Sequence, residues 1–293
     1  MSSIKYLLIT VICSFCFFGS AQKVSGDSLV FALAPWQKDT IMDGVVHEYY
    51  HFDSVQIFNS MQNIHLLRVK NGNSKTNWMI STGSKELIKT SKMAAVNNAV
   101  AGVNGSFFNT KNGGSVNFIR INNVITDTST QDKGPGIYGQ NQSGALAFND
   151  TSFVILERQS PWSGKWEEQI PYPNVMECGP LLLKDRNKAK LLDSPFNNNR
   201  HPRTCVCTTE EEVIVLTADG RNASAQGLSL HELTVVLLWL GCKNGLNLDG
   251  GGSTTFYISD SGIVNMPSDN KLWDHEGERP VSNALLLMSN DIK

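Results

Sequence analysis

The segment SLHELTVVLLWLGCKNGLNLDGGGST, residues 229–254, contains a helix, a strand and a glycine-rich turn in direct succession. Ser229 and Glu232 form a capping box, in which the hydroxyl and the carboxylate each bond an unpaired backbone N–H. Leucine and valine then recur at helical spacing until Gly241 ends the pattern. A short apolar strand, residues 246–248, leads into the glycines. This succession predicts a helix packed on a β-sheet.

Strand patterns dominate the rest of the chain, where apolar and polar residues alternate between turn formers. Three hairpins are predicted, with turns at residues 122–123, 149–150 and 259–262. A second helix is predicted over residues 85–100, where apolar residues share a broad face and proline is absent. We therefore predict an α+β fold, a single domain with a large, mostly antiparallel or mixed β-sheet and a few packed helices.

Residues 1–21 are typical of a secretory signal peptide. Lys5 precedes an apolar run over residues 6–18, and small residues follow at the expected cleavage point. The run is shorter than the roughly 20 residues that cross a bilayer, which favours a signal peptide over a membrane anchor. We expect a secreted or periplasmic protein with no membrane span after processing. Residues 22–75 are predicted to form a strand-rich N-terminal extension, and residues 76–293 the main domain.

The charge of the chain is close to neutral, with 25 basic and 27 acidic residues. Removing the signal peptide with its Lys5 leaves 24 basic against 27 acidic residues, a balance of -3. Such a chain offers no electrostatic reason to expect nucleic acid as a partner. A bound phosphate would have to be held locally, by individual arginines and glycine-rich turns.

Four cysteines follow the signal peptide, and an even number in an exported protein indicates disulfides. Cys205 and Cys207 lie two residues apart in a predicted strand, so they share a face and are poorly placed to bond each other. We expect one bridge from Cys178 or Cys242 to this pair, with buried free thiols as the alternative. A zinc site is disfavoured because no second Cys or His pair has ligand spacing.

Several polar side chains stand where predicted strands end. Asp249 opens the glycine turn, whose N–H groups could converge on an anion, although a tight turn alone also explains three glycines. Glu177 lies at the edge of a buried strand, where burial raises a carboxyl pKa, or where the carboxylate pairs an arginine. Arg203 and Thr204 offer donors matched to a phosphate, and a surface loop equally explains them. Asn104 could donate to a substrate oxygen, or belong to an Asn-Gly turn.

Six motifs in this order resemble the phosphodiester glycosidase family over about residues 80–290. They are Asn-Gly-Ser-Phe-Phe at 104–108, Glu-Cys-Gly-Pro at 177–180, His-Pro-Arg-Thr at 201–204, Asp-Gly-Arg at 219–221, Gly-Leu-Ser-Leu at 227–230 and Asn-Leu-Asp-Gly-Gly-Gly-Ser-Thr at 247–254. The resemblance implies a single α+β domain and hydrolysis of a sugar 1-phosphodiester to free sugar and a phosphate monoester.

The resemblance also implies the site residues. Catalytic roles are expected for Asp249, Glu177, Asn104 and Arg203. Substrate or phosphate binding is expected for Thr204, Asp219, Arg221, Gly250, Gly251, Gly252, Ser253, Thr254 and Arg279. The expected partner is a small-molecule or glycan phosphodiester, and no cofactor or metal is required. A divalent cation held by the oxygen-rich side chains stays open.

In the expected mechanism, Arg203, the glycine backbone and Ser253 hold the phosphate and stabilise its departure. Asp249 or Glu177 then activates water or stabilises the positively charged sugar, as one of a glycosidase pair. Two other functions fit the same residues. One is a non-catalytic binding module for sugar-phosphate polymers of a cell envelope, and the other is a phosphodiesterase that cleaves P–O.

Overall fold

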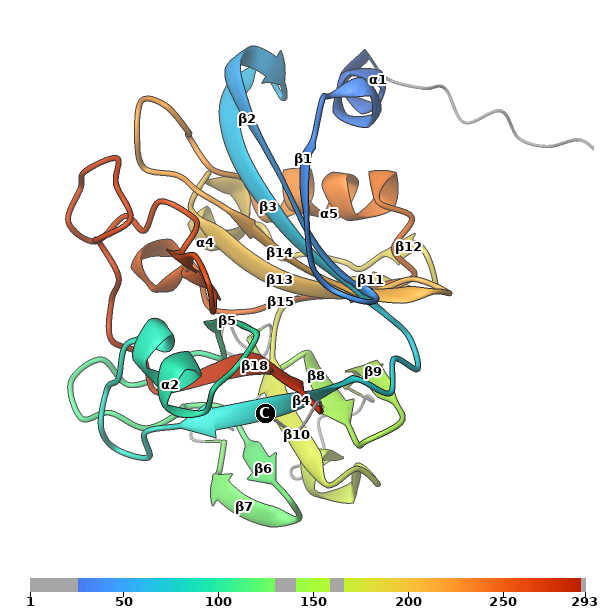
Figure 1. The fold of residues 1–293 in the computed structure, drawn as a ribbon, viewed down its shortest axis with the longest axis vertical. Coiled ribbons are helices and arrows are strands. Elements are labelled where there is room, and N and C mark those ends of the chain that lie inside the picture. Colours follow the sequence, from blue (N-terminus) through green and yellow to red (C-terminus); the bar gives the residue numbers. More distant parts are fainter. Residues whose placement is uncertain (1–25, 130–140, 159–165, 291–293) are drawn as a thin grey trace, which may run out of the picture.

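The computed structural model describes residues 26–129, 141–158 and 166–290 (Figure 1). The predicted signal peptide lies outside these residues. The fold is α+β, and every strand pairing in the described parts is antiparallel. The predicted fold class is confirmed, with the strands divided among one large sheet and two smaller ones.

The large sheet has eight strands. In spatial order they are β1 (Gln37–Met42), β2 (Val45–Ile57), β3 (Ser60–Lys70), β14 (Glu212–Ala218), β13 (Arg203–Thr208), β15 (Asn244–Asn247), β11 (Leu181–Lys184) and β12 (Asn187–Lys188). β3 pairs with β14 along its whole length, from Glu212 opposite Lys70 to Ala218 opposite Ile64. Residues 37–70 of the predicted extension are therefore three strands of this sheet.

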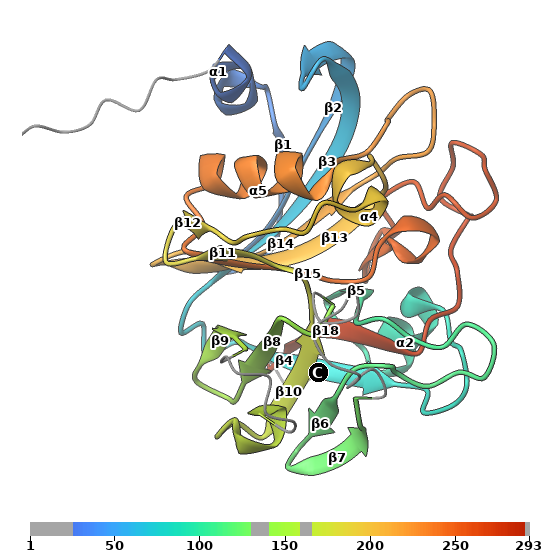
Figure 2. The ribbon, with the colours of Figure 1, turned by 180° about the vertical axis from the view of Figure 1, so that it is seen from behind.

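The two smaller sheets have five strands each. One contains β7 (Val124–Asp127), β6 (Ile119–Ile121), β10 (Asn174–Cys178), β8 (Gly144–Phe148) and β9 (Phe153–Glu157). The other contains β17 (Gly262–Ile263), β16 (Phe256–Ile258), β5 (Ala101–Asn104), β18 (Asn283–Ser289) and β4 (Thr76–Thr82). The three predicted hairpins are confirmed as β6–β7, β8–β9 and β16–β17. Figures 1 and 2 show these sheets in one half of the molecule and the large sheet in the other.

The helices are α1 (Gly26–Leu33), α2 (Thr90–Val96), α4 (Pro195–Asn198) and α5 (Leu230–Trp239), with 3₁₀ turns η1 (Trp166–Gln169) and η2 (Gly251–Ser253). The predicted capping box of α5 is confirmed. The helix predicted over 85–100 is shorter in the structure, where α2 begins at Thr90. Ile88 exchanges backbone hydrogen bonds of 2.8 and 2.9 Å with Val281, and this β-bridge keeps the chain before α2 from being helical. No helix in the described ranges is long and apolar enough to cross a membrane.

Alternation along β13 decides which side chains reach the interior between the sheets. Cys205 and Cys207 belong to the core between the large sheet and α5, and Arg203 shares their face. Val206 belongs to the core between the large sheet and the smaller ones, and Thr204 shares that face. The neighbouring residues Arg203 and Thr204 therefore point to opposite sides of the sheet.

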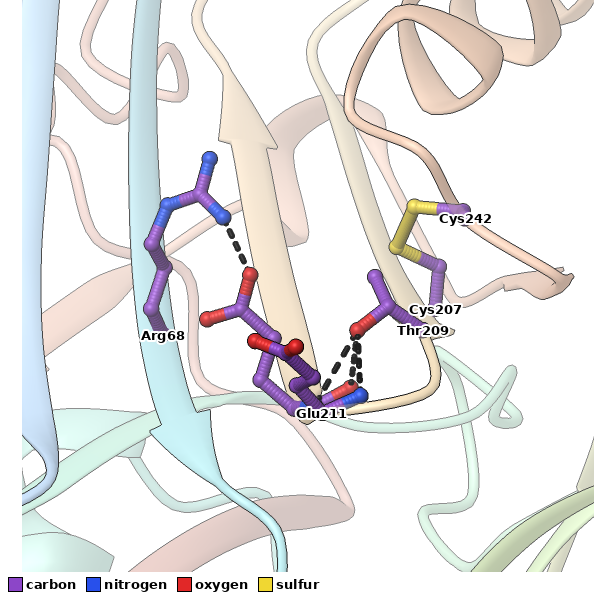
Figure 3. The surroundings of a disulfide bond; sticks show 6 residues. Arg68, Cys207, Thr209, Glu211 and Cys242 are labelled. Atoms are coloured by element: carbon purple, nitrogen blue, oxygen red, sulfur yellow. Dashed lines mark hydrogen bonds and ion pairs between the residues drawn. A yellow bond between two sulfur atoms is a disulfide. The ribbon is translucent and has the colours of Figure 1, made fainter.

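One disulfide connects Cys207 of β13 to Cys242, just after α5 (Figure 3). The expected bridge to the Cys205–Cys207 pair is thus made from Cys242, and both Cys178 and Cys205 are buried free thiols. Beside the bridge, the Thr209 hydroxyl accepts the N–H groups of Glu211 and Glu212 at 3.1 and 3.0 Å. The turn between β13 and β14 is therefore well defined at this end of the sheet.

Candidate active site

Asn104 joins the large sheet to a smaller one. It ends β5, and its carboxamide oxygen accepts the Thr204 hydroxyl at 2.7 Å and the Thr255 N–H at 3.2 Å. Its Nδ2 donates to the backbone oxygen of Asp249 at 2.6 Å. Because Asn104 is fully buried and its bonds are internal, it positions Asp249 and does not face a substrate.

Asp249 follows β15 at the entrance of the glycine turn. Its N–H donates to the Gly105 oxygen at 3.0 Å, and its carboxylate accepts the Gly250 N–H at 2.9 Å. Burial raises the pKa of this carboxyl to about 6, against the opposing effects of Ser253, the Gly250 N–H, Arg279 and Arg221. Asp249 is therefore fixed by backbone hydrogen bonds and has a carboxyl pKa near neutral, a property common at functional sites.

Two arginines lie against the glycine turn. A Cβ added to Gly251 would lie 2.8 Å from Nη2 of Arg221, and one added to Gly252 would overlap the guanidinium of Arg279. Gly251 also has a φ of 62°, which strains any larger residue, and a side chain at Gly252 would have to displace the Arg279–Asp269 pair. Arg279 is paired with Asp269 through bonds of 2.9 and 2.5 Å, whereas Arg221 makes no hydrogen bond or ion pair with any described residue. Arg221 is exposed and presents a free forked donor set beside Asp249.

Most backbone N–H groups of the glycine turn, which were expected to converge on an anion, already donate to acceptors of the protein itself. The N–H of Gly250 bonds the Asp249 side chain, that of Gly251 donates to Pro202 at 2.8 Å, and that of Ser253 donates to Gly250 at 3.2 Å. In contrast, the buried hydroxyls of Thr254 and Thr255 make no hydrogen bond with described residues, whereas the Ser253 hydroxyl lies close enough to Asp249 to lower its pKa. The donors left for a phosphate are the Gly252 N–H, which makes no hydrogen bond with a described residue, and side chains, chiefly the arginines.

Asp219 follows β14 and is buried in a network of amides. Its carboxylate accepts Asn63 at 2.7 Å, Asn265 at 2.8 Å and the Met266 N–H at 3.0 Å. Burial raises its pKa to about 6, although these three bonds oppose the shift. Asn265 also donates to the Thr254 oxygen at 3.2 Å, so Asp219 braces the segment that follows the glycine turn.

Arg203 lies near enough to Arg221 for the charge of Arg221 to lower its pKa, but its guanidinium is turned away from the glycine turn, toward backbone oxygens. Its guanidinium donates to the backbone oxygens of Leu228, Phe196 and Asn199 at 2.8, 2.7 and 3.0 Å, and it lies 5.1 Å from the centroid of the Phe196 ring. Its side chain is 1% exposed, on the face of β13 toward α5. Burial lowers its pKa to about 10, so it stays charged at neutral pH. These contacts make Arg203 a structural arginine and do not fit the expected phosphate-binding role.

Glu177 is also separate from Asp249. Its side chain accepts the Phe118 N–H at 3.2 Å and lies 3.7 Å from Nη1 of Arg158. Burial raises its pKa to about 7, and the nearby Glu167 raises it further. No interaction between Glu177 and Asp249 contributes to either shift. The described residues show no direct contact between the two carboxylates, although both raise the pKa of the buried Cys178 thiol.

Sequence reasoning missed Asn63 and Asn265, the two amides that bind Asp219. Asn63 lies in β3, far from every motif, and other polar residues of the same strand surround it in the sequence, so no local signal marked it. It missed His201 as well, which precedes Arg203 by two residues. Burial and the charges of Arg203 and Arg221 lower the pKa of His201, so this imidazole belongs to the same neighbourhood.

A resident metal has no evident ligand set in the described parts of the chain, where no group of three or more His, Cys, Asp or Glu side chains is arranged to hold one. Asp219 has its oxygens bonded by amide donors, which a cation would have to displace.

Comparison with known proteins identifies the family. The phosphodiester glycosidase family matches residues 97–288. A curated Bacillus subtilis protein, the SPbeta prophage-derived uncharacterized protein YomE, is 28% identical over 96 residues, which is 32% of this chain. The chain spans only 15% of the length of that relative.

Solved structures share the fold. A hypothetical protein from Synechocystis has a TM-score of 0.66 at 15% identity, covering 86% of this chain and 63% of that one. The zebrafish N-acetylglucosamine-1-phosphodiester alpha-N-acetylglucosaminidase catalytic domain, auto-inhibited by its pro-peptide, has a TM-score of 0.64 at 18% identity, covering 86% and 87%. A putative exported protein from Burkholderia pseudomallei has 0.55 at 14%, covering 79% and 75%. With the match over residues 97–288, this chain belongs to the phosphodiester glycosidase family.

Proposed function

We propose that the protein is an exported hydrolase that cleaves a sugar 1-phosphodiester at the anomeric C–O bond, releasing free sugar and a phosphate monoester. One observation carries the proposal: the Asp249 carboxyl, with a pKa of about 6, lies within the electrostatic reach of two arginines that flank the glycine turn. A carboxylate beside a phosphate-binding pair of cations is the arrangement that this reaction needs.

Arg221 and Arg279 hold the phosphate in this proposal, in place of Arg203. The Arg221 guanidinium has all its donors available, and Arg279 is anchored by Asp269 so that its plane is fixed before substrate binds. A guanidinium matches two phosphate oxygens at once. The Ser253 hydroxyl, which lies close to the Asp249 carboxyl, adds a neutral donor in the same turn.

The departing group is a phosphate monoester, which is already acidic and needs little protonation. The two arginines stabilise the negative charge that develops as the C–O bond breaks. Asp249 acts on the sugar side, where its ionised form stabilises the positive charge at the anomeric carbon or accepts the proton of attacking water. At neutral pH a carboxyl with a pKa of about 6 is mostly ionised, as this role demands.

Asn104, Thr204 and Asp219 position this carboxylate. Asn104 binds the backbone of Asp249, Thr204 fixes the orientation of Asn104, and Asp219 braces the segment beyond the turn through Asn265. Export is supported by the Cys207–Cys242 disulfide, because such bonds persist in oxidising compartments, and by the signal-like N-terminus.

The test is an assay of the mature chain, residues 22–293, against UDP-N-acetylglucosamine and the methyl phosphodiester of N-acetylglucosamine 1-phosphate. Asp249→Asn and Arg221→Met are each expected to lose at least about a hundredfold in kcat/KM, since each removes charge that acts in the transition state. Arg186→Met is the matched control, because Arg186 is exposed and pairs only with Glu210 at 3.7 Å.

Hydrolysis in ¹⁸O-labelled water distinguishes the enzymatic alternatives. Cleavage of C–O places the label in the released sugar, whereas cleavage of P–O places it in the phosphate monoester and would contradict the proposal. Saturable binding of the phosphodiesters without any turnover would instead favour a non-catalytic module.

A further inference from the structure

A cleft of about 470 Å³ lies between the N-terminal strands and the loop that precedes β18. Strands β2 and β3 supply one wall, and residues 261–275 supply the other. Figure 1 shows this loop, in red, at the same end of the molecule as the orange loop that follows β14. None of the catalytic steps proposed above uses this space.

Flat rings form both walls of the cleft. On the strand side, Tyr49 stacks on His47 and on His65, with centroids 5.2 and 5.5 Å apart and planes within 16° and 12° of parallel. On the loop side, the Trp273 ring lies 5.6 Å from that of His51. Two facing aromatic surfaces with polar edges suit a ring-shaped ligand that carries hydroxyl groups.

The cleft is not built for an anion. Its lining contains no lysine or arginine among the described residues. Burial lowers the pKa of His47, and lowers that of His65 to about 3, so both imidazoles are neutral at physiological pH. The one carboxylate, Asp39, would repel a phosphate. An uncharged polar ring is the ligand that this surface favours.

The cleft adjoins the candidate active site through direct bonds. Two of its lining groups, the Asn63 amide and the Met266 N–H, bind the Asp219 carboxylate at 2.7 and 3.0 Å. A third, His51, bonds the Ser224 oxygen at 2.9 Å, in the loop that begins with Arg221. The cleft is therefore bonded to the two residues, Asp219 and Ser224, that stand on either side of Arg221 in the chain.

We propose that this cleft binds an uncharged pyranose ring of the substrate, while Arg221 and Arg279 hold its phosphate. The inference rests on the proposed function, and it assigns sugar selectivity to Tyr49, His65 and Trp273. Tyr49 and His65 lie in β2 and β3, outside residues 97–288 where the family match falls, whereas Trp273 lies inside it, so the two walls of the cleft come from different parts of the chain.

The first test is binding in the absence of turnover. The mature chain, labelled with ¹⁵N, is titrated with methyl N-acetyl-α-glucosaminide, methyl α-mannoside, methyl α-glucoside and inorganic phosphate. The Trp273 indole resonance, assigned by its loss in Trp273→Phe, is expected to shift with at least one glycoside and not with phosphate. The Trp78 indole, which packs on Phe153 elsewhere, is the internal control. A Trp273 shift with phosphate, or with none of the glycosides, overturns the proposal.

The second test uses a matched pair of variants in one loop. Trp273→Ala is expected to raise the Kd for the bound glycoside, and KM for the phosphodiester, at least about fivefold, since an aromatic face is lost. Leu272→Ala, at a neighbouring residue that is 61% exposed, is expected to leave both unchanged.

The two tests separate failure of the cleft from failure of the proposed function. Turnover with an unchanged KM in Trp273→Ala refutes the cleft alone. Glycoside binding at Trp273 in a chain that hydrolyses no phosphodiester refutes the proposed function and leaves a sugar-binding site.

Discussion

Replacing Arg203 with methionine should lower the free energy of unfolding of the protein. The size of the loss can be worked out from the three hydrogen bonds that the guanidinium donates. Methionine keeps the length of the side chain and removes the donors to Leu228, Phe196 and Asn199, so three buried backbone oxygens lose their partner. At about 1.5 kcal/mol for each bond to a charged group, the free energy of unfolding falls by about 4.5 kcal/mol. For a domain of this size, this lowers Tm by about 10 °C.

Arg221→Met is the matched control, since it is the same substitution at an exposed arginine without a described partner. Its Tm should change by at most about 2 °C. Circular dichroism melts and kcat/KM at 20 °C, where both variants are folded, separate the two effects. We expect Arg203→Met to lose stability and keep most of its activity, and Arg221→Met to show the reverse. An Arg203→Met protein that melts with the wild type and is inactive would refute this account.

Three further outcomes are expected. Burial raises the Asp249 pKa to about 6, above its value of about 3.9 in an unfolded chain, so the folded state is destabilised as pH rises from 4 through 6. Asp249→Asn mimics the protonated form, so its Tm should exceed that of the wild type above pH 6 and match it below pH 4; equal melts at pH 8 would contradict this. Glu177→Gln should keep kcat/KM within about twofold, because Glu177 is separate from Asp249, and a large loss would return it to the site. Cys207→Ala with Cys242→Ala opens a loop of 35 residues and should cost roughly 4 kcal/mol in urea unfolding, with kcat unchanged at 20 °C.

The elements with strong local signals were predictable from the sequence. The α5 capping box depends on residues three apart, and the turn at Asn122 and Asn123 depends on two residues that tolerate positive φ. The helix over 85–100 was overextended because the pairing of Ile88 with Val281 joins residues far apart in the chain. No local pattern reports such a contact.

The site was predictable by residue type and less so by role. Asp249 and Arg221 could be selected because each stands at a strand end next to glycine. The orientation of Arg203 could not, because the choice between the two faces of β13 depends on which neighbours pack there. The separation of Glu177 from Asp249, and the bond from Asn63 to Asp219, both follow from how three sheets are stacked.

The pairing of β3 with β14 also bears on how the protein is produced for study. Expressing only residues 76–293, the segment around the family match, would remove three strands and leave seven residues of β14 with an open hydrogen-bonding edge. Val213, Val215 and the alternate residues Ile214 and Leu216 make that edge apolar on both faces. Such an edge recruits strands from other chains, so the trimmed protein would aggregate. Recombinant production of this protein should therefore begin upstream of β1.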